Sequence, residues 1–169
     1  MVSLAALDRL DRALLRAART RAHTPALERA VSAYARVGEH AACWLALGAI
    51  GSATARDSER RRGWLRGFGV VAAAVGFNYA VKLTVRRPRP VLAGLPALSP
   101  VISSLSFPSA HATTSFAAAR AYRGLAPSGA LYAAAGAFAL SRPYLGVHYP
   151  SDVAAGAVIG TLLAAGWPQ

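Results

Sequence analysis

The chain has 169 residues, of which 54% are hydrophobic, and a formal net charge of +12. This length suits one domain with a single core, and the mean hydropathy of +0.34 is more typical of a small helical membrane protein than of a soluble enzyme. The arginines stand in short clusters between apolar stretches, which argues against a nucleic-acid-binding face and favours membrane lipids and a phosphorylated substrate as partners. The single cysteine, Cys43, excludes an internal disulfide.

Residues 1–38 have the pattern of an amphipathic helical region. From Ser3 to Arg19, leucines and arginines separate by helical period onto two faces. The leucines are Leu4, Leu7, Leu10 and Leu14, and the arginines are Arg9, Arg12, Arg16 and Arg19. Two interpretations fit equally: a helix that lies on a membrane surface, or one that packs on the domain with a solvated basic face. A second helix is expected from Pro25 to Val37, with Thr24 as its N-cap.

Residues 39–169 are expected to form a membrane-embedded core. Charged residues are mixed through the first turns of the chain, unlike in a secretion signal, so we expect the protein's own spans to hold it in the membrane. The apolar stretches are residues 40–55, 64–81, 109–122, 127–140 and 150–167. Each is close to or below the roughly 20 residues that cross a hydrocarbon core. The predicted fold is therefore all-α, an integral-membrane helical bundle of about five spans with an amphipathic N-terminal helix.

Small residues indicate how two of these helices pack. Gly156 and Gly160 form a small-x3-small pair, which we interpret as generic close packing rather than as a dimer seam. The connection from Arg86 to Pro108 is rich in proline, serine and glycine, which predicts an irregular loop.

Three short segments, residues 82–90, 108–111 and 141–152, hold most of the residues that can handle a phosphate. The first follows the second apolar stretch, the second opens the third stretch, and the last joins the fourth stretch to the fifth. Because successive spans cross in alternate directions, all three segments are expected on the same membrane face. The loop between the first two would then cover a common site.

The basic residues of these segments suit a phosphate ester, whose oxygens need several cations around them. Lys82, the only lysine, offers a compact charge, whereas Arg89 and Arg142 can each donate two parallel hydrogen bonds. Each of them taken alone could instead be a snorkelling residue at the end of a span. Ser109 stands at a predicted helix start, where free N–H groups bind anions, although it could serve only as a cap.

Two histidines have the companions that acid–base and nucleophilic chemistry requires. Asp152 follows His148 by four residues, so its carboxylate could orient the imidazole for attack on phosphorus. His111 is then the candidate acid for the leaving oxygen, and this division predicts a bell-shaped pH dependence. The three side chains could also bind a metal, but the surrounding cations favour a metal-free site. His23 and His40 match no such arrangement, and no site role is expected for them.

Together the segments resemble the three signature motifs of the type 2 phosphatidic acid phosphatase superfamily: Lys-x6-Arg-Pro, Pro-Ser-Ala-His and Ser-Arg-x5-His-x3-Asp. The resemblance implies that Lys82, Arg89, Ser109, the backbone amide of Ala110, and Arg142 bind phosphate. It also implies that His148 forms a phosphohistidine with help from Asp152, and that His111 protonates the leaving group. It implies no metal and no organic cofactor. The family usually has glycine where Ala110 stands.

Within that family, the apolar spans and short chain are most similar to the membrane-bound lipid phosphatases of bacteria. The implied substrate is a lipid-linked phosphate, such as decaprenylphosphoryl phosphoribose, a polyprenyl diphosphate or a phosphatidate-type lipid. The alternatives are a non-catalytic scaffold or lipid-phosphate-binding protein and, third, a soluble nucleic-acid binder. The expected location is the plasma membrane, and the positive-inside tendency places the site on the cytoplasmic side.

Overall fold

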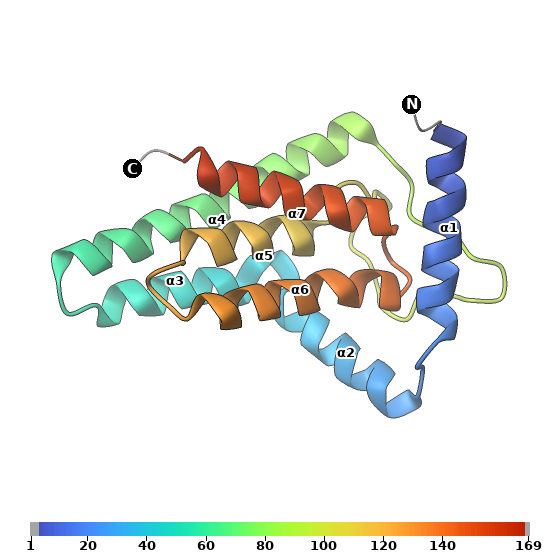
Figure 1. Ribbon diagram of the computed structural model, residues 1–169, viewed down its shortest axis with the longest axis horizontal. Coiled ribbons are helices and arrows are strands. Elements are labelled where there is room, and N and C mark those ends of the chain that lie inside the picture. Colours follow the sequence, from blue (N-terminus) through green and yellow to red (C-terminus); the bar gives the residue numbers. More distant parts are fainter. Residues whose placement is uncertain (1–3, 168–169) are drawn as a thin grey trace.

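The structure, a computed structural model, describes residues 4–167. It is all-α in this range, as predicted, with isolated β-bridges and no strand. The elements are α1 (Leu4–Thr20), α2 (Pro25–Val37), the 3-10 helix η1 (Glu39–Ala41), α3 (Ala42–Thr54), α4 (Ser58–Val85), α5 (Ala110–Ala121), α6 (Ser128–Tyr144) and α7 (Pro150–Ala165). Helices α3 to α7 run along the long axis of the molecule, whereas α1 lies across one end (Figure 1).

Helix α5 is the centre of this bundle and packs against α4, α6 and α7. Its alanines and small polar residues are almost all buried, and this lets the neighbouring backbones approach closely. Around it, a cluster of aromatic side chains fills the core, and two of them make buried hydrogen bonds. The Trp44 ring nitrogen donates to Ser115, 2.8 Å away, and the Tyr122 hydroxyl donates to the Trp44 carbonyl at 2.9 Å.

The small-residue pair on α7 serves the packing of α7 on α5 within one chain. A Cβ atom at Gly160 would lie 2.0 Å from the Thr113 carbonyl oxygen, and one at Gly156 would lie 2.7 Å from the Ser109 carbonyl oxygen. Both neighbours are backbone atoms, one in α5 and one at its N-cap, and they cannot rotate aside as a side chain can. The start of α5 is therefore held against the first turns of α7, and the Ser109 amide donates to the Asp152 carbonyl at 3.0 Å.

Helix lengths do not confirm the expected five spans. Helices α3 to α7 coincide with the five apolar stretches, but among the described residues only α4 is long and apolar enough to cross a membrane by itself. The other four have 12–17 residues. A 12-residue helix rises about 18 Å, against a hydrocarbon core of about 30 Å.

The N-terminal region has a third face that the two-face prediction for α1 missed. Leu7, Leu10 and Leu14 are exposed, which agrees with the membrane-surface interpretation and not with packing of the leucine face on the domain, whereas Ser3 and the side chain of Leu4 lie outside the described part. Arg19, which was expected on the solvated basic face, is buried, and it donates to the Pro96 and Tyr144 carbonyls. The prediction for Arg19 was wrong because Asp11, Leu15 and Arg19 are spaced by four and so form one stripe toward the protein.

The predicted second helix is confirmed. Helix α2 covers Pro25–Val37, and the Thr24 side chain accepts a hydrogen bond from the Leu27 amide, as an N-cap does. Helix α7 likewise begins at Pro150, and residues 86–109 contain no helix.

We predict that Gly160→Ala lowers the free energy of unfolding by about 1–3 kcal/mol, because the new methyl group overlaps the backbone of α5. Gly136→Ala on α6 is the matched control. A Cβ there meets nothing within 4 Å, so higher helix propensity should make that variant equally or slightly more stable. Thermal unfolding in detergent measures both changes. Equal stability of the two variants would show that α5 and α7 do not depend on this contact.

Candidate functional site

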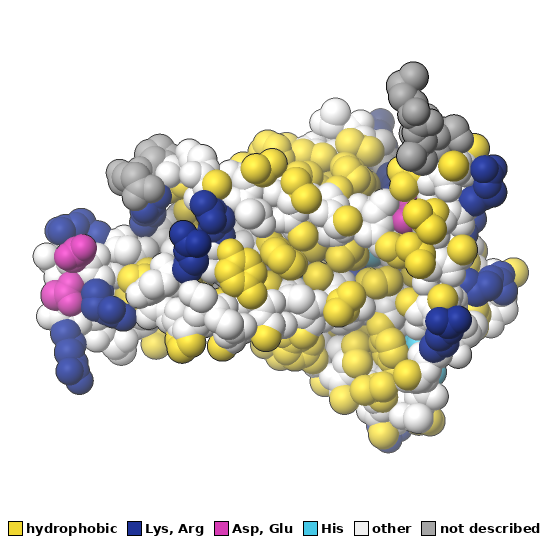
Figure 2. Space-filling view, viewed as in Figure 1, with side chains coloured by type: hydrophobic (Ala, Val, Ile, Leu, Met, Phe, Trp, Pro, Cys, Tyr) yellow, Lys and Arg dark blue, Asp and Glu magenta, His cyan; other side chains and the backbone are white. Residues whose placement is uncertain are grey.

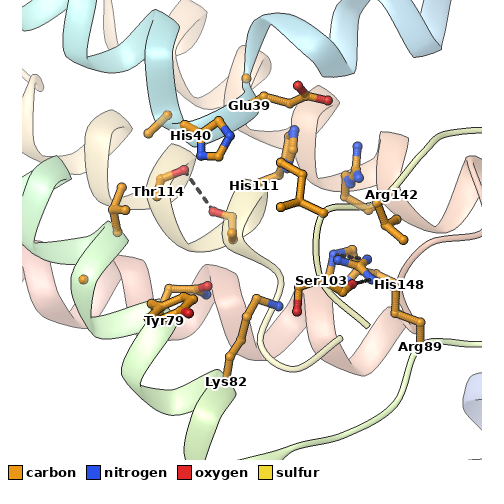
Figure 3. Close-up of a pocket in the computed structure, with 18 of the residues that line it drawn as sticks. Glu39, His40, Tyr79, Lys82, Arg89, Ser103, His111, Thr114, Arg142 and His148 are labelled. Carbon is orange, nitrogen blue, oxygen red and sulfur yellow. Dashed lines mark hydrogen bonds between the residues drawn. The ribbon is translucent and has the colours of Figure 1, made fainter. Parts of the chain in front are cut away.

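The three segments singled out in the sequence meet at a single cavity of about 480 Å³ (Figure 3). Each segment contributes side chains to its wall, although the segments lie far apart in the sequence. The expected site residues that line the cavity are Lys82, Arg89, Ala110, His111, Arg142 and His148. This arrangement agrees with the expectation that the three segments lie on the same face.

Three cations stand in this wall without an acidic partner. Lys82 donates to the carbonyls of Leu105 and Ser106, each 3.2 Å away. Arg142 is only 6% exposed, and its Nε atom makes no hydrogen bond within the described part of the chain. Among residues 4–167, no carboxylate lies within ion-pair distance of these two side chains or of Arg89. Buried cations of this kind are costly unless an anion joins them, so the cavity is built to receive one.

Arg89 links this cluster to the histidine of the third segment. Its Nε donates to the Ser103 carbonyl at 2.6 Å and its Nη1 to the Val147 carbonyl at 2.7 Å. The same Nη1 lies 3.2 Å from Nε2 of His148. Because a guanidinium can only donate, Nε2 must accept, and the imidazole proton is therefore on Nδ1. The nitrogen that faces the cavity thus carries a lone pair, as a nucleophile requires.

Burial, aided by the nearby arginines, lowers the pKa of His148 to about 3, although Asp152 acts in the opposite direction. The side chain is 3% exposed. His148 is therefore neutral at physiological pH, which keeps the lone pair of Nε2 available.

Asp152 lies behind His148 and outside the cavity lining. Its Oδ2 atom is 3.6 Å from Nδ1 of His148 and accepts a hydrogen bond from the Tyr149 amide at 2.9 Å. Its Oδ1 accepts from Arg87 at 2.7 Å. The expected histidine–carboxylate pair is thus adjacent in space, and Arg87, an unassigned position inside the first segment, belongs to it.

Ser109 and Ala110 occupy the start of α5, as the helix-start pattern predicted. Ser109 is the N-cap and is fully buried, and its amide is already bonded to the Asp152 carbonyl. Only Ala110 of the two lines the cavity. Ser109 therefore acts on the site in this structure by positioning the end of the helix.

His111 lines the cavity from the first turn of α5. Its Nε2 donates to the Ala35 carbonyl at 2.9 Å, which anchors the ring to the end of α2. A proton for a leaving oxygen would then come from Nδ1. That donation requires the doubly protonated ring.

The sequence reasoning missed several residues of the cavity wall, and three of them are polar or charged side chains close to the expected ones. Asn78 precedes Lys82 by four residues, so a polar residue on the same face of α4 was the available signal. Glu39 and His40 also line the cavity, as Figure 3 shows. His40 gets there through left-handed backbone at His40 (φ 53°) and Ala41 (φ 59°), which no sequence pattern indicated.

The described residues contain no group of three or more histidine, cysteine, aspartate or glutamate side chains arranged to hold a metal ion. His23, for which no site role was expected, lies outside the cavity lining. It contacts Glu28 and the Ala18 carbonyl and stacks on Tyr144.

Comparison with known proteins gives matches in sequence and in fold. A family model described as the PAP2 superfamily matches residues 63–169. The decaprenylphosphoryl-5-phosphoribose phosphatase of Mycobacterium tuberculosis (strain H37Rv) is 38% identical over 128 residues, which are 76% of this chain and 71% of the relative. The enzyme of the same name from Mycolicibacterium smegmatis is 42% identical over 130 residues, or 73% of this chain and 68% of the relative.

Two solved structures share the fold. Aquifex aeolicus LpxE superposes with a TM-score of 0.78 at 23% identity, over 92% of this chain and 93% of that one. A transmembrane PAP2 type phosphatidylglycerolphosphate phosphatase from Bacillus subtilis gives a TM-score of 0.75 at 24% identity, over 97% and 85% of the two chains.

We predict that Arg142→Met raises the stability of the ligand-free protein by about 1–3 kcal/mol, because it removes a buried cation whose Nε makes no hydrogen bond and which has no ion-pair partner among residues 4–167. The same change should abolish the rise in unfolding temperature that phosphate or vanadate gives the wild-type protein. Thermal unfolding in detergent with and without each anion measures both effects. Arg29→Met, at an exposed position on α2, should leave the anion response unchanged. An unaltered response in Arg142→Met would contradict the phosphate-binding assignment.

A second prediction concerns the charge of His148. Since burial and the nearby cations lower its pKa, the ring should stay neutral from pH 8 down to pH 5, where an ordinary histidine would be mostly protonated. A bound phosphate dianion acts in the opposite direction and should raise this pKa. NMR of ¹⁵N-histidine-labelled protein, with His148 assigned from the signal lost in His148→Ala, tests both statements. A ligand-free midpoint near 6.5 would contradict them.

Proposed function

The chain belongs to the PAP2 superfamily and is a lipid phosphatase, and we propose that it removes the terminal phosphate of a polyprenyl-linked phosphosugar. The substrate class follows the two relatives, which are named for decaprenylphosphoryl-5-phosphoribose. The observation that carries the proposal is the cavity that gathers His148 with three cations lacking acidic partners. Those cations are opposite in charge to a phosphate group and suit its three non-bridging oxygens.

The size and lining of the cavity support a substrate larger than phosphate. Beyond the cations, the wall includes Tyr79 of α4 and Val101 and Ile102 of the loop. Tyr79 is 62% exposed and Ile102 is 80% exposed, so apolar side chains stand at the opening. A polyprenyl chain could leave the cavity over these side chains while the phosphate remains among the cations.

In the proposed reaction, the substrate phosphate takes Arg89 away from His148 Nε2 and so frees its lone pair. Nε2 attacks phosphorus, the P–N bond forms, and the P–O bond to the sugar breaks. Doubly protonated His111 gives its Nδ1 proton to the leaving oxygen, and Asp152 stabilises the positive charge on the His148 ring. Neutral His111 then takes a proton from a water molecule, whose oxygen attacks phosphorus; the P–N bond breaks, inorganic phosphate leaves, and both histidines return to their starting states. Lys82, Arg89 and Arg142 neutralise the phosphoryl oxygens throughout.

We further propose that α3 to α7 form the five spans and are embedded in a bacterial plasma membrane, with the cavity at one boundary and α1 along the surface. Figure 2 supports this placement, since the basic side chains visible there lie toward the two ends of the molecule and apolar atoms cover much of the middle. The short α5 need not face lipid, because α4, α6 and α7 pack around it. The positive-inside tendency favours a cytoplasmic cavity.

The test is phosphate release from decaprenylphosphoryl-5-phosphoribose in detergent with EDTA present. We expect turnover without added metal, and a higher kcat/KM than for a polyprenyl diphosphate. His148→Ala should reduce kcat by about a thousandfold or more, because the nucleophile is lost. His23→Gln, which changes a histidine outside the cavity, should keep near wild-type activity. Full activity of His148→Ala would refute the assignment, and a preference for the diphosphate would refute the substrate class.

A further inference from the structure

Helix α1 carries a buried acidic residue on the face that it turns toward the bundle. Asp11 is 2% exposed, although Leu10 and Leu14 on the same helix are 54% and 48% exposed. Because α1 lies across the end of the bundle where α7 begins (Figure 1), this carboxylate reaches the first turn of α7. A buried charge is costly without partners, and Asp11 has several.

The partners of Asp11 are the residues that hold Asp152. Arg87 donates from Nη2 to Asp11 Oδ2 at 2.8 Å and from Nη1 to Asp152 Oδ1 at 2.7 Å. The Ser151 amide donates to Asp11 Oδ1 at 2.9 Å, and the Ser151 hydroxyl donates to Asp11 Oδ2. Asp11 thus satisfies an N–H group at the start of α7, where a helix has no internal partner to offer. The two carboxylates are joined through one guanidinium.

This arrangement determines both the position and the effective charge of Asp152. One oxygen is held by Arg87, and the other is held by the Tyr149 amide and faces Nδ1 of His148. If Arg87 paired with Asp152 alone, it would neutralise the carboxylate that must stabilise a positive imidazole. Because Asp11 shares the guanidinium, the three groups keep a net charge of about −1 beside His148.

We propose that Arg87 and Asp11 are positioning residues for the reaction, so that α1 helps to orient the reacting residues through Asp11 and is not only a surface helix. The proposal rests on the proposed roles of His148 and Asp152. Arg87 acts by orienting Asp152, and Asp11 acts by sharing the charge of Arg87 and by fixing the first turn of α7. Neither residue lines the substrate cavity, so they should influence the chemical step and leave substrate binding largely intact.

The test compares Asp11→Asn and Arg87→Lys with the wild-type protein in detergent. Asp11→Asn keeps the shape of the side chain and one acceptor oxygen, but Asp152 is then the only carboxylate that pairs with Arg87. In Arg87→Lys, the single ammonium group cannot donate to two carboxylates in parallel as a guanidinium does. Each should lower kcat and the single-turnover rate constant by about tenfold or more, the size typical of groups that orient a reacting residue. KM should change by less than about threefold, because binding is not affected.

Asp8→Asn is the matched control, because Asp8 lies on the same helix but pairs with Arg12 on an exposed face. It should retain the wild-type rate constants. The single-turnover rate constant separates misfolding from positioning, because it does not depend on how many molecules are folded, and thermal unfolding in detergent measures whether each variant is folded. A wild-type rate constant in Asp11→Asn, or an equal loss in Asp8→Asn, would overturn the proposal.

The same variants distinguish an error in the positioning role of Asp11 and Arg87 from an error in the role of His148. If His148→Ala is inactive while Asp11→Asn and Arg87→Lys react at the wild-type rate, only the positioning role is wrong. If His148→Ala stays active, the assignment of the nucleophile fails, and the positioning role that depends on it fails as well.

Discussion

The site depends on holding three cations around one cavity, two of them buried, with no acidic partner among residues 4–167. Like charges repel strongly where water is excluded, so Lys82, Arg89 and Arg142 must be kept in place by the rest of the fold. Backbone carbonyls do much of this, and they come from the loop after α4 and from the connection between α6 and α7. The free energy of folding therefore maintains a charge arrangement that a phosphate would complete, and donors that are fixed before the ligand arrives need no reorganisation during the reaction.

Two helix starts give this arrangement its rigidity. Helices α5 and α7 both begin at the cavity end, and Gly156 and Gly160 allow their backbones to touch. The Ser109 amide is bonded to the Asp152 carbonyl, so the segment that carries His111 is tied to the segment that supports His148. Backbone packing between α5 and α7 therefore determines how the two histidines are placed relative to each other. This explains why Ser109 has no free amide, although it stands where an anion could otherwise bind.

Much of the site could be predicted from the sequence, because its chemistry is concentrated in short segments and because alternating helices bring these to one end. The N-cap at Thr24 could be predicted equally well, since it depends on local geometry. Buried polar residues could not be predicted in the same way. Arg19 and Asp11 have the same residue types as the exposed positions beside them, and only tertiary packing separates the two groups. His40 depends on a left-handed backbone conformation that occurs without glycine, so neither composition nor periodicity indicated it.

In the proposed placement, α1 links the membrane boundary to the residues that hold Asp152. The lipid chain of the substrate lies in the hydrocarbon region of the membrane, whereas its phosphate lies in the polar region. A lipid phosphatase must therefore hold the reacting phosphorus at a fixed distance from the boundary between these two regions. In this fold, the helix that presents Leu7, Leu10 and Leu14 outward is also bonded through Asp11 to the first turn of α7. If those leucines rest in the lipid boundary, the distance from that boundary to His148 is set by one short chain of hydrogen bonds. Displacement of α1 would then disturb Asp152 before it disturbed the phosphate cavity, since the cations are held by carbonyls that α1 does not supply.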